Sequence, residues 1–400
     1  MIRLRETKSM SLSKIAQAIG TSATIKLNET ANELRAQGKP VIHLGGGEPK
    51  SKAPQSAVDA AAEKLKTGEI RYTPSAGIMP LRELVADYTE THYGRKPAPK
   101  NILISAGAKQ AIMMALQAVL NPGDELIYPV PYWVSYPEMV RLVGARPVAV
   151  IPQSPSGEPT LDEFKVAVTS ATRAIMLNSP NNPSGIVYSR EFISDIVEFC
   201  EDQGIYLIMD DIYHRLVFDG KSAANCYEFS SRELDESKII LINGVSKSYA
   251  MTGFRIGWAI ASKEVTAAMS RIQSHFSSGT SELTQWAAIG ALKGGEESVD
   301  SLRATLEKQR NLLVGLFNSM EGVKVNKPGG TFYAFPDFSA VEKDSTKLAD
   351  YLLKKALVVT VPGIEFGLEG HLRISFCGAE NDITEGCQRI GKVLGELRSR

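Results

Sequence analysis

The sequence predicts an α/β fold built on a mostly parallel sheet. Short apolar runs rich in Val and Ile have the length of buried strands, and they lie at 102–105, 125–129, 148–151, 174–177, 205–209, 239–242 and 256–261. Helical patterns separate many of these runs. Strands that alternate with helices form parallel sheets whose two faces are both covered by helices.

Residues 189–204 illustrate the helical pattern. Ser189 is suited to an N-cap, because its hydroxyl can accept a hydrogen bond from the first turn. Apolar residues from Phe192 to Cys200 recur at helical spacing and form one stripe. Gly204 is suited to the position just after the helix, where a left-handed conformation is common.

The chain of 400 residues predicts two domains with a cleft, because a single core stops growing at about 250–300 residues. We expect a large domain at 46–290, which carries the predicted strands. After about residue 290 the pattern changes to a long charged helix, a glycine-rich hairpin at 327–338 and a final helix. Residues 291–400 therefore predict a smaller α+β domain, which residues 1–45 complete with an amphipathic helix.

The composition argues against several classes of partner. Lys plus Arg and Asp plus Glu number 45 each, so no net charge recruits nucleic acid or an anionic membrane. The four cysteines form no CxxC pair and the five histidines no HExxH motif, and we expect no metal site. No uncharged run approaches the roughly 20 residues that span a bilayer. We expect a cytoplasmic protein that binds small molecules or a second copy of itself.

Polar or glycine-rich stretches follow five of the predicted strands. They read AGAKQ, VPYW, NSPNNPSG, DDIY and NGVSK. Ligands of open α/β sheets bind beyond the carboxyl ends of the strands. We therefore expect the five stretches to converge on one site.

One of these stretches is a candidate phosphate site. Gly107 and Ala108 open an apolar helix, so their backbone N–H groups can point at an anion. Two other phosphate motifs are excluded. Ser246 and Leu241 stand where a P-loop requires glycines, and Lys50 stands where a dinucleotide fingerprint ends in glycine.

Lys247 follows an apolar strand and lies among glycines. Desolvation at such a position lowers the pKa of a lysine and makes its amine available for Schiff-base chemistry. A carbonyl cofactor at this amine needs a phosphate anchor, a carboxylate at its ring nitrogen and an aromatic face. Arg255, Asp210 and Trp133 are the candidates for these three roles.

With these residues the chain resembles the class I/II pyridoxal-phosphate aminotransferases, of the aspartate aminotransferase type found in bacteria, archaea and plastids. The segment GVSKSYAMTGFRIG fits the family motif [GS]-x-[GSTA]-K followed eight residues later by arginine. The resemblance begins at about Leu12 and continues through RYTPSAGIMPLRE, PYWVSYPEM, NSPNNPSG and DDIY to LRISF. It implies the fold type I transferase architecture, with pyridoxal 5′-phosphate bound by the large domain.

The resemblance implies the catalytic roles. Lys247 would hold the cofactor through a Schiff base and then carry the proton between the substrate Cα and the cofactor. The family's D-x-x-Y spacing selects Asp210, which would keep the ring nitrogen protonated, together with Tyr213. Tyr213 and Asn182 would hydrogen-bond the phenolic oxygen, and Trp133 would stack on the ring.

The resemblance also implies how the phosphate is held and which residues cross between subunits. The phosphate would lie among Gly107, Ala108, Lys109, Ser246 and Arg255. Tyr72 and Ser278 would reach it from a second subunit. A homodimer with shared active sites is therefore expected.

The substrate residues follow from the same resemblance. Arg373, in HLRISF, would bind the α-carboxylate in a two-pronged fashion. Animal-type aspartate enzymes hold the side-chain carboxylate with an arginine of the neighbouring subunit, but the stretch QSHFSSGTSELTQ has none. In the resembling subgroup a lysine and a serine do so, here Lys109 and Ser22, although Gly-Thr replaces the usual Lys-Pro before the serine. Further substrate contacts are expected from Gly47, Trp133 and Asn182.

We therefore expect an aspartate:2-oxoglutarate aminotransferase with a ping-pong mechanism. Aromatic, alanine, glutamine-type and prephenate aminotransferases are alternatives, and an uncharged pocket of Gly46, Phe276 and Phe332 would favour some of them. A pyridoxal-phosphate lyase or decarboxylase could use the same fold. A non-catalytic sensor fused to a DNA-binding module is not expected, because only about ten residues precede the match.

Overall fold

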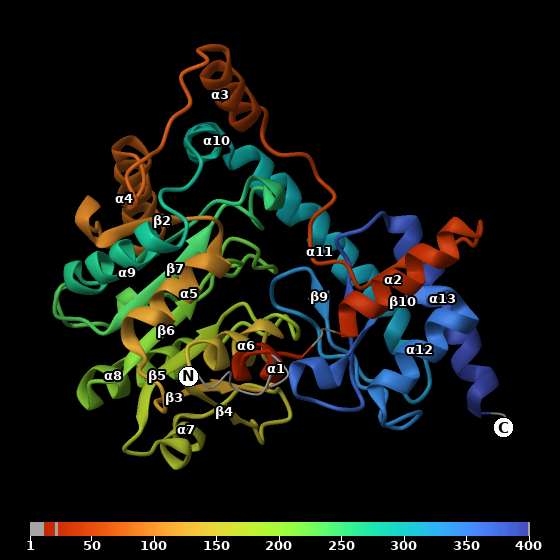
Figure 1. Ribbon diagram of the computed structural model, residues 1–400. Coiled ribbons are helices and arrows are strands. Elements are labelled where there is room, and N and C mark those ends of the chain that lie inside the picture. Colours follow the sequence, from red (N-terminus) through yellow and green to blue (C-terminus); the bar gives the residue numbers. More distant parts are fainter. Residues whose placement is uncertain (1–11, 21–22, 399–400) are drawn as a thin grey trace, which may run out of the picture.

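The computed structural model describes residues 12–20 and 23–398. Its main sheet has seven strands in the order β2-β8-β7-β6-β5-β3-β4, and only β8 runs antiparallel to its neighbours (Figure 1). The mostly parallel sheet predicted from the sequence is therefore confirmed. Its strands are β2 (Ile102–Ser105), β3 (Glu125–Pro129), β4 (Arg146–Val150), β5 (Thr172–Asn178), β6 (Tyr206–Asp210), β7 (Ile239–Gly244) and β8 (Gly257–Ile260).

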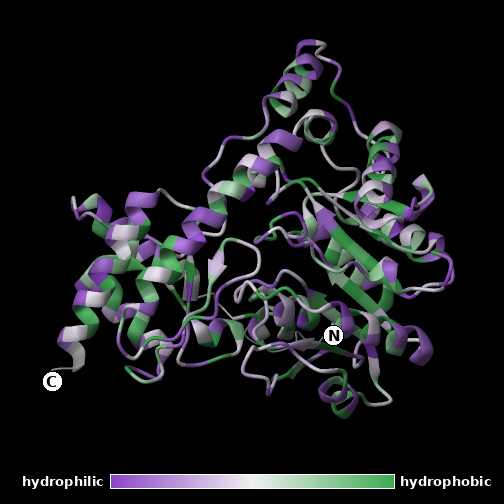
Figure 2. Cartoon of the chain, turned by 180° about the vertical axis from the view of Figure 1, so that it is seen from behind, coloured by the Kyte–Doolittle hydropathy of each residue, from purple (hydrophilic) through white to green (hydrophobic). Residues whose placement is uncertain are grey.

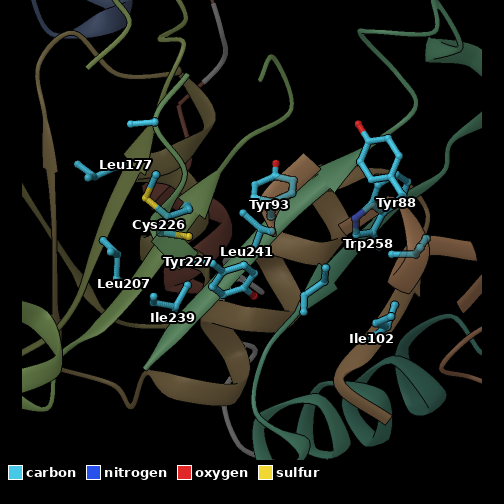
Figure 3. Packing of buried hydrophobic residues seen from close by; sticks show 14 of the residues in the cluster. Tyr88, Tyr93, Ile102, Leu177, Leu207, Cys226, Tyr227, Ile239, Leu241 and Trp258 are labelled. Carbon is cyan, nitrogen blue, oxygen red and sulfur yellow. The ribbon is translucent and has the colours of Figure 1, made fainter. Parts of the chain in front are cut away.

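Both faces of this sheet are buried, as is usual for a mostly parallel sheet. Successive side chains of a strand point to opposite faces, so each strand contributes to two cores. Leu207 and Met209 of β6 pack into one hydrophobic cluster, whereas Ile208 between them packs into another. Figure 3 shows part of the first cluster, in which Leu207 and Leu241 lie near Tyr227 and Cys226. The neighbouring helices are α3 (Gln55–Lys66), α4 (Met79–Tyr93), α5 (Ala108–Val119), α6 (Ser135–Leu142), α7 (Leu161–Ala167), α8 (Arg190–Gln203), α9 (Lys263–Phe276) and α10 (Glu282–Gly294).

Helix α8 has the ends that the sequence predicts. The Ser189 hydroxyl accepts a hydrogen bond from the N–H of Phe192, and Gly204 ends the helix with a φ of 67°. Such a positive φ is strained for residues with a Cβ and is readily adopted by glycine. In Figure 2 the strands of the main sheet are largely hydrophobic, whereas hydrophilic residues face outward on the surrounding helices.

A second hydrophobic cluster lies at the other end of the molecule, around α12 and α13 (Figure 1). A three-stranded antiparallel sheet, β11-β12-β9, and a parallel pair, β1-β10, belong to this region. The elements of this region are α2 (Ala23–Ala36), β1 (Ile42–His43), α11 (Glu296–Asn318), β9 (Tyr333–Ala334), α12 (Ser345–Ala356), β10 (Val358–Val359), β11 (Val361–Pro362), β12 (Leu372–Ser375) and α13 (Glu380–Arg398). The short helix α1 (Lys14–Ala18) lies beside α6 instead. Short 3-10 helices are η1 (Pro99–Asn101), η2 (Cys226–Glu228), η3 (Thr252–Phe254) and η4 (Gly363–Phe366).

The long helix α11 joins the two ends. Val299 near its start packs into the core beside the main sheet, whereas Leu302 and Leu306, about one and two turns further on, pack into the second core. The division at 46–290 and 291–400 stays a prediction. The hairpin expected at 327–338 is wrong in its pairing, since β9 pairs with β12, while Gly330 bridges to Val217.

The topology places the predicted polar stretches together. Strands β2, β3, β5, β6 and β7 all run in one direction, so the segments after them emerge at one edge of the sheet. This edge faces the second core, and the cavity described below lies there. No helix in the described part of the chain is long and apolar enough to cross a membrane.

A buried arginine joins α11 to the segment after β6. Arg310 is 0% exposed, and its guanidinium donates two hydrogen bonds of 2.8 Å to the Asp219 carboxylate and one of 3.0 Å to the carbonyl of Pro328. Its hydrogen bonds, followed by those of Lys327, hold the pKa of Asp219 well below its usual value. Asp219 has a φ of 60°, a left-handed conformation that aspartate and asparagine tolerate.

We expect Asp219→Asn to lower the free energy of unfolding by about 2–3 kcal/mol, because it leaves a buried guanidinium without its main counter-charge. The value is below the usual cost of breaking a buried pair, since Glu307 still lies 3.3 Å from Arg310. Urea denaturation measures the change. The matched control is Asp300→Asn at an exposed helical pair with Arg303, which should cost less than about 0.5 kcal/mol. Equal effects of the two variants on the free energy of unfolding would contradict a stabilising role of the Arg310–Asp219 pair.

Candidate active site

A cavity of about 550 Å³ lies at the carboxyl edge of the main sheet. It is lined both by the segments that follow the strands and by residues of the N-terminal and C-terminal regions. The sequence-predicted site residues that line it are Gly47, Ala108, Lys109, Trp133, Asn182, Asp210, Tyr213, Ser246, Lys247, Arg255 and Arg373. Residues up to 345 positions apart along the chain are thus brought to one cavity, with Asn28 and Arg373 the extremes.

Lys247 lies in the turn after β7. Its Nζ donates a hydrogen bond of 2.6 Å to the carbonyl of Gly47 and lies 5.8 Å from the ring centroid of Phe332. Burial, followed by the positive charge of Arg373, lowers the pKa of Lys247 to about 8. A substantial fraction of the amine is therefore neutral near physiological pH, and the neutral amine is the nucleophile in carbonyl chemistry.

Asp210 ends β6 and is 4% exposed. The Tyr136 hydroxyl donates a hydrogen bond of 2.6 Å to its Oδ2, and the Ile212 N–H lies 3.4 Å from its Oδ1. Burial raises the pKa of Asp210 to about 6 despite these hydrogen bonds. A cation next to this carboxyl would lower its pKa again, so the site favours a ligand with a protonated nitrogen at this point.

The start of α5 and Arg255 form a concave surface suited to an anion. The first N–H groups of a helix have no partner within the helix, and α5 begins at Ala108 after Gly107, which has a φ of 87°. A Cβ at Gly107 would lie 2.6 Å from the Arg255 guanidinium. The buried Ser246 hydroxyl has no hydrogen-bond partner among the described residues. A phosphate would provide the acceptors that these groups require.

Lys109 lies next to this surface and next to Trp133. Its Nζ is 4.8 Å from the centroid of the Trp133 ring. Burial, followed by the charge of Arg255, lowers the pKa of Lys109. Trp133 in turn contacts Tyr136 edge to face, with ring centroids 5.5 Å apart. One wall of the cavity therefore combines an aromatic face with a cation.

Arg373 of β12 is a buried cation with no ion-pair partner in the described residues. Its guanidinium donates hydrogen bonds of 3.1 Å to Oδ1 of Asn182 and to the carbonyl of Gly45, and its Nε is unpartnered. The ring centroids of Tyr333 and Phe366 lie 4.3 and 5.0 Å from it. A buried guanidinium held in this way has the charge and the geometry that suit a carboxylate.

Tyr213 and Asn182 lie between these groups. Tyr213 is buried and hydrogen-bonded to Tyr333. The backbone N–H of Asn182 donates a hydrogen bond of 2.8 Å to Oδ1 of Asn178, which also bonds the carbonyl of Asp210 through its amide nitrogen at 2.7 Å. Asn178 therefore joins Asn182 to Asp210, while Tyr213 is held by Tyr333.

Some predicted residues lie outside the cavity. Tyr72 is 96% exposed and Ser278 is also exposed, and neither lines the cavity in this single chain. Ser22 falls outside the described residues. The uncharged pocket expected from three residues is not assembled within the chain: Gly46 lines the cavity, whereas Phe276 is 67% exposed and Phe332 is buried behind the lining.

The structure also adds residues that the sequence did not single out. Tyr136 reaches Asp210 from the first turn of α6, and its only signal is its place in the motif PYWVSYPEM. His43 and Asn28 line the cavity and are joined by a hydrogen bond of 2.7 Å between Nε2 and Oδ1. Burial, followed by the charge of Arg35, lowers the pKa of His43.

The residues present fit pyridoxal phosphate. The unpartnered Ser246 hydroxyl, the start of α5 and Arg255 match its phosphate, Asp210 matches its ring nitrogen, and the Lys247 amine matches its aldehyde. The described residues contain no group of three or more His, Cys, Asp or Glu side chains that could hold a metal ion. The donor set thus favours an organic phosphate.

We expect Tyr136→Phe to weaken the binding of pyridoxal phosphate by about tenfold to a hundredfold, because a hydrogen bond to a charged group contributes about 1.5–3 kcal/mol. Its loss raises the pKa of Asp210 further, so less of the carboxyl is ionised at neutral pH. Titration of the apoprotein followed by absorbance measures the affinity. The control is Tyr128→Phe, a buried tyrosine of the same hydrophobic cluster. An unchanged cofactor affinity in Tyr136→Phe would contradict a role of the Tyr136–Asp210 hydrogen bond in cofactor binding.

Comparison with known proteins agrees with this geometry. Residues 39–390 match the family model described as aminotransferase class I and II. An aspartate aminotransferase of Streptomyces avermitilis is 37% identical over 392 residues, 95% of this chain and 96% of the relative. A probable aspartate/prephenate aminotransferase of Aquifex aeolicus is 38% identical over 384 residues, 94% of this chain and 96% of the relative.

The fold agrees as well. The solved structure of the Thermus thermophilus aspartate aminotransferase with maleate superposes with a TM-score of 0.91 at 35% identity, and the match covers 96% of this chain and 100% of that one. The predicted fold type I architecture is therefore confirmed. Sequence, fold and the chemistry of the cavity agree that the chain belongs to the class I and II aminotransferases and is a pyridoxal-phosphate-dependent enzyme that acts on amino and oxo acids.

Proposed function

We propose that this aminotransferase transfers the amino group of L-aspartate to 2-oxoglutarate by a ping-pong mechanism. The observation that carries the proposal is the set of cations lining the cavity. Arg255 accounts for the cofactor phosphate, and Lys247 for the aldehyde. Arg373 and Lys109 remain, one for each carboxylate of a dicarboxylic acid. Balanced charge is required in a buried site, since an unpaired buried ion is costly.

When bound, pyridoxal phosphate supplies an aldehyde that condenses with amines and a ring that accepts the electron pair released at the substrate Cα. Arg373 binds the α-carboxylate and thereby fixes the amino group beside Lys247. The Lys247 amine, with its pKa lowered to about 8, would remove the substrate Cα proton and return it at the cofactor carbon that carries the aldehyde. Asp210 would keep the ring nitrogen protonated, while Tyr213 and Asn182 would donate hydrogen bonds to the phenolic oxygen.

The choice of aspartate rests on Lys109. The ammonium lies over the face of Trp133, where it can meet a second carboxylate of a substrate whose first is held by Arg373. The names of the relatives support an acidic substrate, and the Thermus thermophilus structure was solved with maleate, itself a dicarboxylate. Ser22, the second residue proposed for this role, lies outside the described residues.

Prephenate is the main alternative, because the Aquifex aeolicus relative is named for both activities. Prephenate also carries two carboxylates, so the same pair of cations could bind it. A lyase on this fold is a further alternative of a different reaction class. Incubation with the amino acid alone separates the lyase from both transaminases, since a transaminase stops after one turnover without an oxo acid.

A homodimer with shared active sites forms part of the proposal. The segments of Tyr72 and Ser278 adjoin each other: the Thr73 hydroxyl donates a hydrogen bond of 2.8 Å to the carbonyl of Thr280. Both residues are exposed, and Phe276 lies exposed on the neighbouring helix end. An exposed aromatic pair on adjoining segments is typical of a surface that a partner covers.

A screen of amino-acid donors against 2-oxoglutarate tests the reaction, and glutamate formation is the readout. We expect aspartate to be the best donor, and Lys109→Ala to lower kcat/KM for aspartate by about a hundredfold while an aromatic donor changes less than tenfold, since a buried charged contact contributes about 2–3 kcal/mol. The cofactor affinity of the variant is measured in parallel to separate loss of the phosphate contact. Lys100→Ala, at an exposed lysine, is the control. An unchanged donor preference would contradict aspartate as the substrate.

Mixed dimers test the shared site. Lys247→Ala and Tyr72→Ala subunits should each be weakly active alone. After dissociation and reassociation of an equal mixture, about a quarter of wild-type activity should return, because half of the dimers are mixed and each of these has one intact site. Sedimentation velocity measures the fraction of subunits that are in dimers. Failure of the mixture to regain activity, although mixed dimers form, would place Tyr72 in the site of its own subunit.

A further inference from the structure

A second aspartate follows Asp210 directly and faces away from the cofactor cavity. Asp211 is 2% exposed, and its Oδ1 has no hydrogen-bond partner among the described residues. The Tyr93 hydroxyl of α4 is hydrogen-bonded to its carboxyl. No Lys, Arg or His in the described chain forms an ion pair with it. A buried, unpaired carboxylate is strongly disfavoured, and such a group keeps its proton instead.

Five side chains that pack around Asp211 are neutral. Burial lowers the pKa of His214 to about 3, so its imidazole is uncharged. Tyr88 and Tyr93 face Asp211 from α4, and Cys226 and Tyr227 face it from η2, and all of these carry raised pKa values. The charged side chains on this side are Asp210, Arg95, whose guanidinium lies 5.5 Å from the Tyr227 ring centroid, and three that line a cavity of about 180 Å³ together with Asp211. These three are Arg215, Lys221 and Arg303, of which Arg215 and Arg303 pair with Glu296 and Asp300.

Hydrogen bonds connect Asp211 to the strand that carries Lys247. The Asn243 amide nitrogen donates a hydrogen bond of 2.9 Å to the Tyr93 hydroxyl and lies 3.1 Å from Nδ1 of His214. Nδ1 of His214 also lies 3.0 Å from the carbonyl of Asp211, and its Nε2 lies 2.9 Å from the Tyr88 hydroxyl. The Asn243 Oδ1 accepts a hydrogen bond of 2.7 Å from the N–H of Gly244.

This network thus joins two points of the active site from behind. One end is the residue after Asp210, and the other is the start of the turn that leads to Ser246 and Lys247. Strands β6 and β7 are adjacent there, and the N–H of Asp211 donates a hydrogen bond of 2.9 Å to the carbonyl of Ile242. A change in the network would therefore alter the spacing between the acid and the amine of the cavity.

We propose that Asp211 is a positioning residue that must keep its proton: as a neutral carboxyl it joins Tyr93 and Asn243 in a hydrogen-bonded network that fixes Asp210 relative to Lys247. Ionisation would place a second negative charge beside Asp210, and no Lys, Arg or His of the described residues forms an ion pair with Asp211 that would offset it. The proposal rests on the role given above to Asp210 and is independent of the amino-acid substrate.

The geometry has a consequence for stability. Burial raises the pKa of Asp211 to about 8, with a further contribution from the charge of Asp210. Between its unfolded value near 4 and this raised value, the folded state holds more protons than the unfolded state. Asp211 therefore lowers stability increasingly as the pH rises through that window. A carboxyl kept at such a cost fits a functional role.

Asp211→Asn keeps the shape of the neutral carboxyl and removes its titration. Above pH 8 we expect the wild-type holoenzyme to lose bound cofactor during dialysis. We also expect the absorbance spectrum of the cofactor that stays bound to change with pH. The variant should retain the cofactor and its spectrum to about one pH unit higher, since one ionisation is removed. Its thermal midpoint should also fall less between pH 6 and 9 than that of the wild type. Glu201→Gln is the control, since Glu201 is buried and bonded to Ser230 and Ser237 far from the cavity.

Tyr93→Phe tests the network without changing a charge at the pH of assay. It should lower kcat more than it raises KM, and it should shift the cofactor spectrum at pH 7. Identical pH dependences of spectrum and cofactor retention in the wild type and Asp211→Asn would overturn the proposal. A pH effect on the thermal midpoint alone would do so too, because it would show a structural role only. Asp210→Asn separates the two ideas, since it should lose cofactor at every pH if the role of Asp210 is right.

Discussion

The hydrogen-bonded register between β6 and β7 is the constraint on which the active site depends. It pairs Asp210 with Ile242, and the turn to Lys247 begins two residues after Ile242. The acid and the amine are therefore placed by backbone geometry, before any side-chain contact is made. Because both strands are buried on both faces, a slip in register by one residue would move every side chain into the opposite core, where the packing does not fit it, and this fixes the spacing between the two groups.

Burial gives these groups their chemical properties. It lowers the pKa of Lys247 and raises the pKa of Asp210, so both move toward neutral pH from opposite sides. Arg373, held between two aromatic rings, adds a fixed positive charge that needs no rearrangement when a carboxylate arrives. The cavity is thus preorganised for an anionic substrate and a cationic ring nitrogen.

The sequence predicted the fold and most of the cavity because both depend on local patterns. Apolar runs located the seven strands to within two residues, and polar segments after parallel strands must share an edge. The role of Tyr136 was not predictable, since a tyrosine in an apolar helix is usually a core residue. The contact of His43 with Asn28 depends on packing between segments whose sequences show no link. The pocket expected from Gly46, Phe276 and Phe332 stays a prediction, because Phe276 is exposed in the single chain and the sequence does not give the direction of its side chain.

Helix α11 spans the boundary between the two hydrophobic cores. Val299 and Leu302 are less than one helical turn apart, yet each belongs to a different core. Because the helix is packed into both cores, a displacement of one core must move or bend the turn between Val299 and Leu302. Loss of packing in one core also removes support from the helix that stabilises the other, so the stabilities of the two cores are coupled.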